Sequence, residues 1–227
     1  NAVAISGSRA EATAALVTSG SLVEVSDAAV TINDADGVAL NASDLSAIGA
    51  KTTGTVTVTN AVAISGNTSQ TTAALLTESS KVVLSASNTV VTVSDSLNVA
   101  QASAIALVTN ADAGFSAGVK DTYASIMDGN NPTSAAASIV SDDANVQFTV
   151  TDSITYAQAK ELHADIISGK AASAIFTISD TAAVLKGIID TPQVGTGDGI
   201  DDVLDYAASI VVNSGTLTTA DIDQLGK

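Results

Sequence analysis

Acidic side chains gather between Asp190 and Asp205, and their spacing could support metal chemistry. The segment reads "DTPQVGTGDGIDDVLD", and its glycines include Gly197 and Gly199. Its carboxylates are Asp190, Asp198, Asp201, Asp202 and Asp205. Carboxylate oxygens on a glycine-rich loop can wrap a hard cation, so Ca²⁺ is a possible ligand here. The alternative, which we favour, is a solvated acidic loop in which Asp201 or Asp202 caps a helix over "DDVLDYAA".

A second acidic stretch, "NDADGVALNASDL", begins at Asn33. Its acids and turn residue are Asp34, Asp36, Gly37 and Asp44. An EF-hand loop needs acids at its first and twelfth positions. Placing Asp36 fifth puts Ile32 first and Ser43 twelfth, so the EF-hand register fails. A turn followed by a helix cap explains these residues without a metal.

Aspartates also follow short β-branched stretches, where strands are expected to end and helices to begin. They stand in the pairs Asp95-Ser96, Asp152-Ser153 and Asp180-Thr181. Stacked side by side, such residues could line a row of cations. We favour Asx-type turns, in which each carboxylate accepts hydrogen bonds from free backbone N–H groups.

Nothing in the sequence assembles a catalytic constellation. The chain has no cysteine, and its single histidine, His163, lies in "AQAKELHADIISG". We expect a helix there that ends at Gly169, with His163 on its solvated face. No G-x-S-x-G motif is present, and "GTGDG" at 195–199 lacks the Lys-Ser/Thr of a phosphate loop. We therefore expect no enzyme. A polysaccharide lyase or hydrolase is the weaker alternative, because Arg9 is the single arginine.

The elements that position these residues are marked by an internal repeat. "NAVAISG" occupies 1–7 and returns at 60–66. Each copy leads into a capping-box pattern, Ser8…Glu11 or Asn67…Gln70, and then a short helical run. The same pattern recurs at Asn41…Asp44, Asn98…Gln101, Thr155…Gln158 and Thr218…Asp221. The repeated text therefore encodes a strand, a cap and a helix.

Pairs of short strands separate these helices. They are expected over 22–33, 55–65, 81–94 and 137–150. A strand–strand–helix cycle of about 30 residues is typical of stacked repeats that bury one another's faces. We predict an α/β solenoid with short parallel strands and a row of short helices. The alternative is a pair of compact α/β domains with a boundary near Asn110.

Two stretches depart from the strand–strand–helix repeat and define the expected division of the chain. Regular repeats are expected over 1–110 and 137–227. Between them, 111–136 reads as an irregular insertion, with a helix over 116–127 and a "GNNP" stop. The Gly- and Asp-rich stretch at 189–202 reads as a long loop, and loops that depart from a regular scaffold often carry function.

The amino-acid composition and net charge of the chain disfavour several classes of binding partner. The chain has 227 residues, and 46% are hydrophobic but only 3% aromatic. The net charge of −16 disfavours nucleic acid and anionic lipid. No apolar run is long enough to cross a membrane, so we expect no membrane insertion. The chain begins at Asn1 instead of Met, and we expect a processed product or a piece of a longer protein.

The phrases "VTVSDS", "FTVTDSITYAQAKEL" and "FTISDTAAVL" resemble the tandem repeats of large acidic bacterial surface and secreted proteins, of the cyanobacterial type. The resemblance is one of style and carries no site residue. It implies an extracellular or cell-surface location and an adhesive or layer-forming role. Adjacent repeats, like subunits or surface carbohydrate would be the partners.

The sequence thus predicts a non-catalytic structural or adhesion repeat module of a larger extracellular protein, with self-assembly as one form of its role. A Ca²⁺-dependent carbohydrate- or surface-binding module is one alternative. A phage fibre-like structural protein is another.

Overall fold

The structure is a computed structural model that describes residues 3–21, 23, 25–79, 82–167, 172–189, 203–204 and 206–225. Backbone contacts divide the chain into an N-terminal unit, Asn1–Ala117, and a C-terminal unit, Gly118–Lys227. Both units are built from short parallel strands that lead into short helices. The predicted α/β class with short parallel strands is therefore confirmed.

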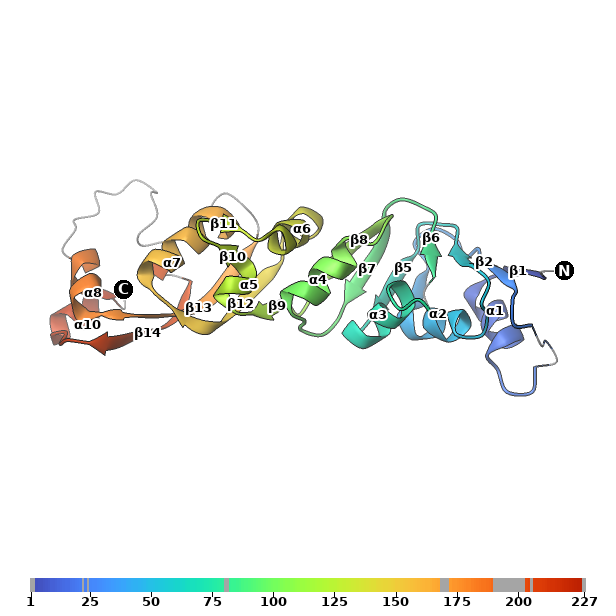
Figure 1. The fold of residues 1–227 in the computed structure, drawn as a ribbon, viewed down its shortest axis with the longest axis horizontal. Helices are drawn as coiled ribbons and strands as arrows, with labels where there is room; N and C mark the ends of the chain where they lie inside the picture. Colours follow the sequence, from blue (N-terminus) through green and yellow to red (C-terminus); the bar gives the residue numbers. More distant parts are fainter. Residues whose placement is uncertain are drawn as a thin grey trace. The chain divides into compact units, whose positions relative to one another are not determined.

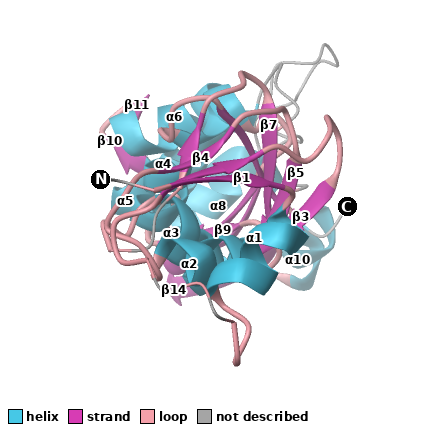
Figure 2. Cartoon of the chain, turned by 90° about the vertical axis from the view of Figure 1, so that its right-hand side faces the viewer, coloured by secondary structure: helices cyan, strands magenta, loops and turns pink. Residues whose placement is uncertain are grey.

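Two four-stranded parallel sheets form the N-terminal unit. The first sheet has the order β1 (Ala4–Gly7), β2 (Ala29–Ile32), β4 (Val56–Val58) and β6 (Val83–Leu84). The second has the order β3 (Ala39–Asn41), β5 (Ala63–Gly66), β7 (Thr89–Val93) and β8 (Ala111–Phe115). The helices are α1 (Arg9–Leu16), α2 (Ala42–Gly49), α3 (Thr68–Leu75) and α4 (Val99–Ala106). Figure 2 shows β1 and β4 crossing the direction of β3, β5 and β7, with α1, α2 and α3 grouped beside them.

Each helix, together with the strand or strands that lead into it, is called a strand–helix segment below. The chain runs through a strand of the first sheet, a corner, a strand of the second sheet and then a helix, as in β2-β3-α2, β4-β5-α3 and β6-β7-α4 (Figure 1). This is the predicted order. At two corners, Gly37 and Asn88 adopt positive φ just before β3 and β7. A left-handed residue there reverses the chain tightly enough for both strands to pack on one core. Asn110 also has a positive φ, in the connection from α4 to β8.

The two "NAVAISG" copies end in different sheets, since β1 belongs to the first and β5 to the second. What the copies share is the junction from strand to capped helix. The Ser8 and Asn67 side chains accept from the backbone N–H of Glu11 and Gln70, whose side chains accept from the cap backbone in return. The hydrogen bond from the Ser8 backbone lowers the pKa of the Glu11 carboxyl.

Of the other predicted caps, three are confirmed and one is wrong. Reciprocal bonds also form at Asn98…Gln101, Thr155…Gln158 and Thr218…Asp221. The prediction at Asn41 is wrong, because its side chain makes no cap hydrogen bond. Asp44, the expected partner, lies instead 3.2 Å from the Arg9 guanidinium, in an ion pair that joins α2 to α1.

One parallel sheet organises the C-terminal unit, in the order β14 (Ala207–Ser214), β13 (Ser173–Thr181), β12 (Gln147–Ile154) and β9 (Val119–Asp121). A small antiparallel hairpin joins β10 (Met127–Asp128) to β11 (Asn131–Pro132). The helices are α5 (Tyr123–Ile126), α6 (Ser134–Asp142), α7 (Tyr156–Leu162), α8 (Ala182–Ile189) and α10 (Thr219–Leu225). A π-helical turn, His163–Ile167, continues α7.

The helix predicted over 116–127 is wrong, since β9, the short α5 and the start of β10 occupy that stretch. Gly118 explains the difference: its φ is +73°, and a Cβ there would lie 2.6 Å from the Gln147 carbonyl oxygen. A strand expected at the start of 137–150 is also wrong, because α6 covers it. Thr133 caps α6 at the Ala136 N–H, and the alanine-rich run that follows favours helix.

Polar side chains bond successive segments of the N-terminal unit. In each case, a donor reaches a backbone carbonyl about one segment earlier. These bonds are Thr52 Oγ1 to Ala28 O (2.7 Å), Thr59 Oγ1 to Ile32 O (3.1 Å), Asn60 Nδ2 to Asp34 O (2.7 Å) and Asn110 Nδ2 to Leu84 O (2.8 Å). Carbonyls at the strand ends are thus satisfied by the neighbouring segment instead of by solvent.

The fourth residue of the helices α1–α5, α7 and α8 is buried against the core, whereas the fourth residue of α6, Ala137, is exposed. The buried residues are Ala12, Leu45, Thr71, Ala102, Ile126, Ala159 and Leu185. Thr71 is the polar exception. Its side chain is fully buried, and its Oγ1 makes no hydrogen bond in the part of the chain that the structure describes.

Thr71→Val should therefore stabilise the fold, because a buried hydroxyl without a partner costs roughly 1–3 kcal/mol. Valine keeps the β-branched shape and removes the polar atom. We expect the free energy of unfolding in urea to rise by about 1 kcal/mol. The adjacent Thr72 is partly exposed, so Thr72→Val is the matched control and should change stability little. A less stable Thr71→Val variant would mean that the hydroxyl has a partner.

Candidate functional site

The predicted metal ligands, Asp190, Asp198, Asp201, Asp202 and Asp205, lie outside the described residues. Within the described ranges, no three His, Asp or Glu side chains lie close enough to share a metal ion. The acids of the strand-to-helix turns are described, and their bonding partners can be assigned one by one.

Aspartates near the ends of strands accept a hydrogen bond from the first backbone N–H of an earlier helix. Asp34 accepts from the Arg9 N–H at 2.6 Å, and Asp95 accepts from the Thr68 N–H at 2.6 Å. In the C-terminal unit, Asp152 accepts from Tyr123 at 2.7 Å and Asp180 from Tyr156 at 3.1 Å. We call this recurring contact the aspartate clamp.

The clamp suits the electrostatics of a helix start. The first N–H groups of a helix have no partner within it, and the aligned peptide dipoles place partial positive charge there. A carboxylate both satisfies the N–H and stabilises that charge. The interpretation of Asp95, Asp152 and Asp180 as acceptors for free N–H groups is thus confirmed, although the clamped donors come from the neighbouring segment.

The acids of the "NDADG" stretch are engaged in the same way. Besides the clamp at Asp34, Asp36 Oδ1 accepts from the Ala61 N–H at 2.9 Å. Asp44 pairs with Arg9. Gly37 adopts a φ of +75° and donates its N–H to the Ala61 carbonyl. The turn at Asp36 and Gly37 thus bonds to the next segment, whereas Asp34 and Asp44 bond to the segment before.

His163 lies inside the protein, so the prediction of a solvated position is wrong. Its side chain is only 9% exposed, and its ring centroid lies 5.9 Å from that of Tyr206. The buried residues Tyr156, Ala159, Leu162, His163 and Ile166 have the 3.6-residue spacing of one helical face, so the helical period places His163 inward. The expectation of a solvated position rested on the polar residue type and not on this spacing.

Tyr123 and Glu161 form a pair that the sequence did not reveal, because Tyr123 was assigned to the wrong helix. The Tyr123 hydroxyl donates to Glu161 Oε2 at 2.8 Å, and Tyr123 is 8% exposed. Burial first, and then the bond to Glu161 and its charge, raises the pKa of Tyr123 well above its ordinary value near 10. The phenol is therefore held as a neutral hydrogen-bond donor, which is a structural role.

The segment β14–α10 exposes apolar residues on both its helix and its strand. Ile222 is the fourth residue of α10 and is 56% exposed, and α10 has no buried residue. Val211 and Val212 on β14 are 46% and 39% exposed, and their register partners on β13 are Ser179 and Asp180. Because successive strand residues point to opposite faces of a sheet, the two valines do not share a face. We call Ile222 together with the exposed edge of β14 the open face; it is the candidate functional surface of the C-terminal unit.

Asp95→Ala removes one clamp and should lower the free energy of unfolding by about 1 kcal/mol, the usual cost of losing a helix cap. Asp95 also accepts from Thr68 Oγ1 at 2.8 Å, so both contacts are lost together. Asp27→Ala, at an exposed bend, is the control and should have little effect. The loss should be the same with EDTA; a loss seen only with Ca²⁺ present would indicate that Asp95 is a metal ligand.

Tyr123→Phe should reduce the loss of stability at alkaline pH. The folded-state pKa is raised, so the Tyr123 contribution is complete below about pH 10 and is lost as pH rises toward the folded value. Urea unfolding of both proteins at about pH 9 and about pH 11 tests this, because every other group titrates equally in the two chains. Equal losses in the two proteins would contradict the assignment.

Within the described ranges, no helix has both the length and the apolar character needed to cross a bilayer. Comparison with protein-family models, curated proteins and solved structures finds no match to this chain.

Proposed function

We propose that this chain is a non-catalytic structural or adhesion module of a larger extracellular or cell-surface protein. In this proposal the strand–helix segments are coils of an α/β solenoid, and the open face on β14 and α10 is where a further coil of the same construction stacks. The observation that carries the proposal is the exposure of Ile222 at a helix position that is otherwise buried in the helices α1–α5, α7 and α8.

Stacking is supported by how the segments bond. Parallel pairing links β1 to β2, β2 to β4 and β4 to β6 in the first sheet. In the second sheet it links β3 to β5, β5 to β7 and β7 to β8. Short strands of this kind satisfy their backbone only through their neighbours. A segment at the end of such a row presents the same unpaired edge and apolar face to the next.

The non-catalytic part of the proposal is supported by the contacts of the described side chains that could take part in catalysis, because each of them has a structural role. The clamp aspartates accept backbone N–H groups, His163 is packed on Tyr206, and Tyr123 is held protonated by Glu161. The extracellular part is supported by the resemblance of the repeat text to bacterial surface proteins.

The open face gives the proposal its test, because a second copy of the chain can supply the missing neighbour. We expect sedimentation velocity to show association that increases with protein concentration. Ile222→Asp should weaken this association by about tenfold or more, since burying an isoleucine is worth roughly 1.5–3 kcal/mol and 1.4 kcal/mol is a factor of ten.

The control is Val38→Asp, which places the same charge on another exposed valine, in the corner before β3. It should associate as the unsubstituted chain does. A chain that stays monomeric from micromolar to millimolar concentration, with constant stability, would contradict stacking through this face. Equal weakening by both substitutions would indicate a general effect of charge.

A further inference from the structure

The first sheet of the N-terminal unit lacks a strand beside β6. Both α2 and α3 are followed by a first-sheet strand, β4 or β6, before the chain turns into the second sheet. After α4 ends at Ala106, the chain passes directly to β8, which starts at Ala111 in the second sheet. β6 is consequently the last strand of its sheet, while β7 has β8 beside it.

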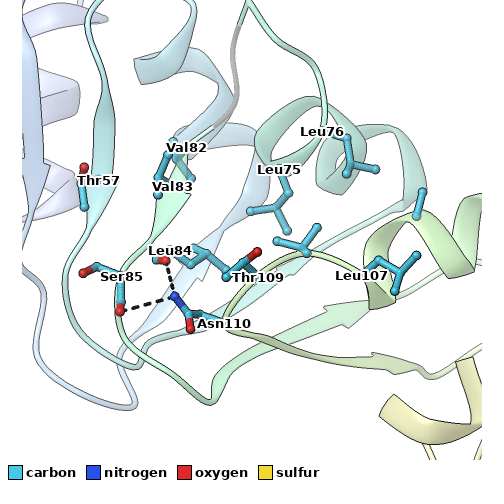
Figure 3. A pocket seen from close by; sticks show the side chains of 12 residues that line it. Thr57, Leu75, Leu76, Val82, Val83, Leu84, Ser85, Leu107, Thr109 and Asn110 are labelled. Carbon is cyan, nitrogen blue, oxygen red and sulfur yellow. Dashed lines mark hydrogen bonds between the residues drawn. The ribbon is translucent and has the colours of Figure 1, made fainter. Parts of the chain in front are cut away.

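A groove of about 640 Å³ occupies the place of the missing strand. Its floor is made by β6 and the end of α3, and the end of α4 forms a wall (Figure 3). The apolar side chains that line it include Leu75, Leu76, Val83 and Leu107. Leu107 is 69% exposed and Val83 is 46% exposed, so no described element of the N-terminal unit covers this surface.

We propose that this groove binds a short extended peptide segment from another protein chain, which adds to the first sheet as a parallel strand beside β6. The chemistry of the occupant follows from the neighbouring strands. β4 and β6 pair over two positions, Thr57–Val83 and Val58–Leu84. An added strand would therefore place two or three residues beside β6, and β-branched residues suit these positions. Addition of a strand to an open sheet edge is a general mode of peptide recognition.

The lining selects an uncharged segment. Besides the apolar residues, the described residues of the lining include Thr57, Ser85, Thr109 and Asn110, and none of the lining residues that the structure describes is charged. A charged residue entering the groove would lose hydration without an ionic partner. Alternating small polar and β-branched residues, as in "TVTVTN" at 55–60, meet both the apolar wall and the hydroxyl groups.

Asn110 marks where the added strand would bond. Its amide donates to the Leu84 carbonyl at 2.8 Å, from a backbone with a φ of +67° (Figure 3). The side chain thereby occupies an edge carbonyl that an added strand would otherwise meet. A bound segment replaces this amide with its own backbone N–H, so the edge is protected when the groove is empty.

The test uses the full chain and a labelled, terminally blocked peptide, GTVTVTN, which copies residues 54–60. Fluorescence anisotropy should show saturable binding with a Kd of roughly 10–500 µM, as expected for a short strand addition. The peptide GTVPVTN should not bind, because proline removes a backbone donor from the ladder.

Matched substitutions on α4 locate the site. Ala104 lines the groove and Ala100 does not, and both are exposed. Ala104→Phe should fill the groove and reduce binding at least tenfold, whereas Ala100→Phe should bind as the unsubstituted chain does. Circular dichroism checks that both variants fold.

Asn110→Gly provides an independent readout, because glycine keeps the positive φ and releases the Leu84 carbonyl. This variant should bind GTVTVTN at least as tightly as the unsubstituted chain. The proposal is overturned by any of three results: no binding at about 1 mM peptide, equal binding of GTVPVTN, or binding unaffected by Ala104→Phe. Loss of binding in Asn110→Gly would also overturn it, since the peptide would then be bonding to the amide and not to the strand edge.

Discussion

Short parallel strands cannot satisfy their own backbone, and the rest of this structure depends on that constraint. A strand such as β4, Val56–Val58, has its N–H and C=O groups met by β2 on one side and β6 on the other. Polar side chains outside the strand ladders also form hydrogen bonds to the neighbouring segment. Thr59 and Asn110 donate to carbonyls one segment back, and the clamp aspartates accept from helix N–H groups one segment back. Order in one segment therefore requires order in its neighbour.

Features encoded locally could be predicted from the sequence. A capping box joins residues three apart, so Ser8…Glu11 and Asn67…Gln70 identify the starts of α1 and α3 without knowledge of the fold. The stretch before α3 likewise gives β5, and the β-branched stretch before α4 gives β7. The α/β class follows, because alternating strands and helices favour parallel pairing.

Features set by distant contacts could not be predicted. Asn41…Asp44 has the spacing of a cap, but Arg9, 35 positions before Asp44, competes for the carboxylate. The donor to Asp95 lies 27 residues earlier, so the sequence indicated its role as an acceptor but not its partner. His163, by contrast, was misplaced from its residue type, although its spacing of four and seven residues from the buried Ala159 and Tyr156 places it inward. The groove beside β6 is formed where a strand is missing, which a search for recurring elements does not detect.

The same aspartates contribute to the acidic charge and bond neighbouring segments to one another. The net charge of −16 would be a source of repulsion in a compact chain. Where a carboxylate lies on a helix start, as Asp34 and Asp95 do, part of that charge is offset by the helix dipole. An acidic composition and a close-packed row of segments are compatible here because clamp aspartates join neighbouring segments.

The one-sided support of α10 has a consequence for how the chain loses structure. Helix α10 packs on α8, has no buried residue, and lies beside the edge strand of its sheet. Local opening costs least where few apolar contacts are lost, so amide hydrogens in α10 and β14 should exchange before those of β12 and β13. A neighbour stacked on the open face would remove this difference. Slower exchange in α10 and β14 would then show that a neighbour covers the open face. The more of this face the neighbour covers, the less readily α10 and β14 would unfold locally.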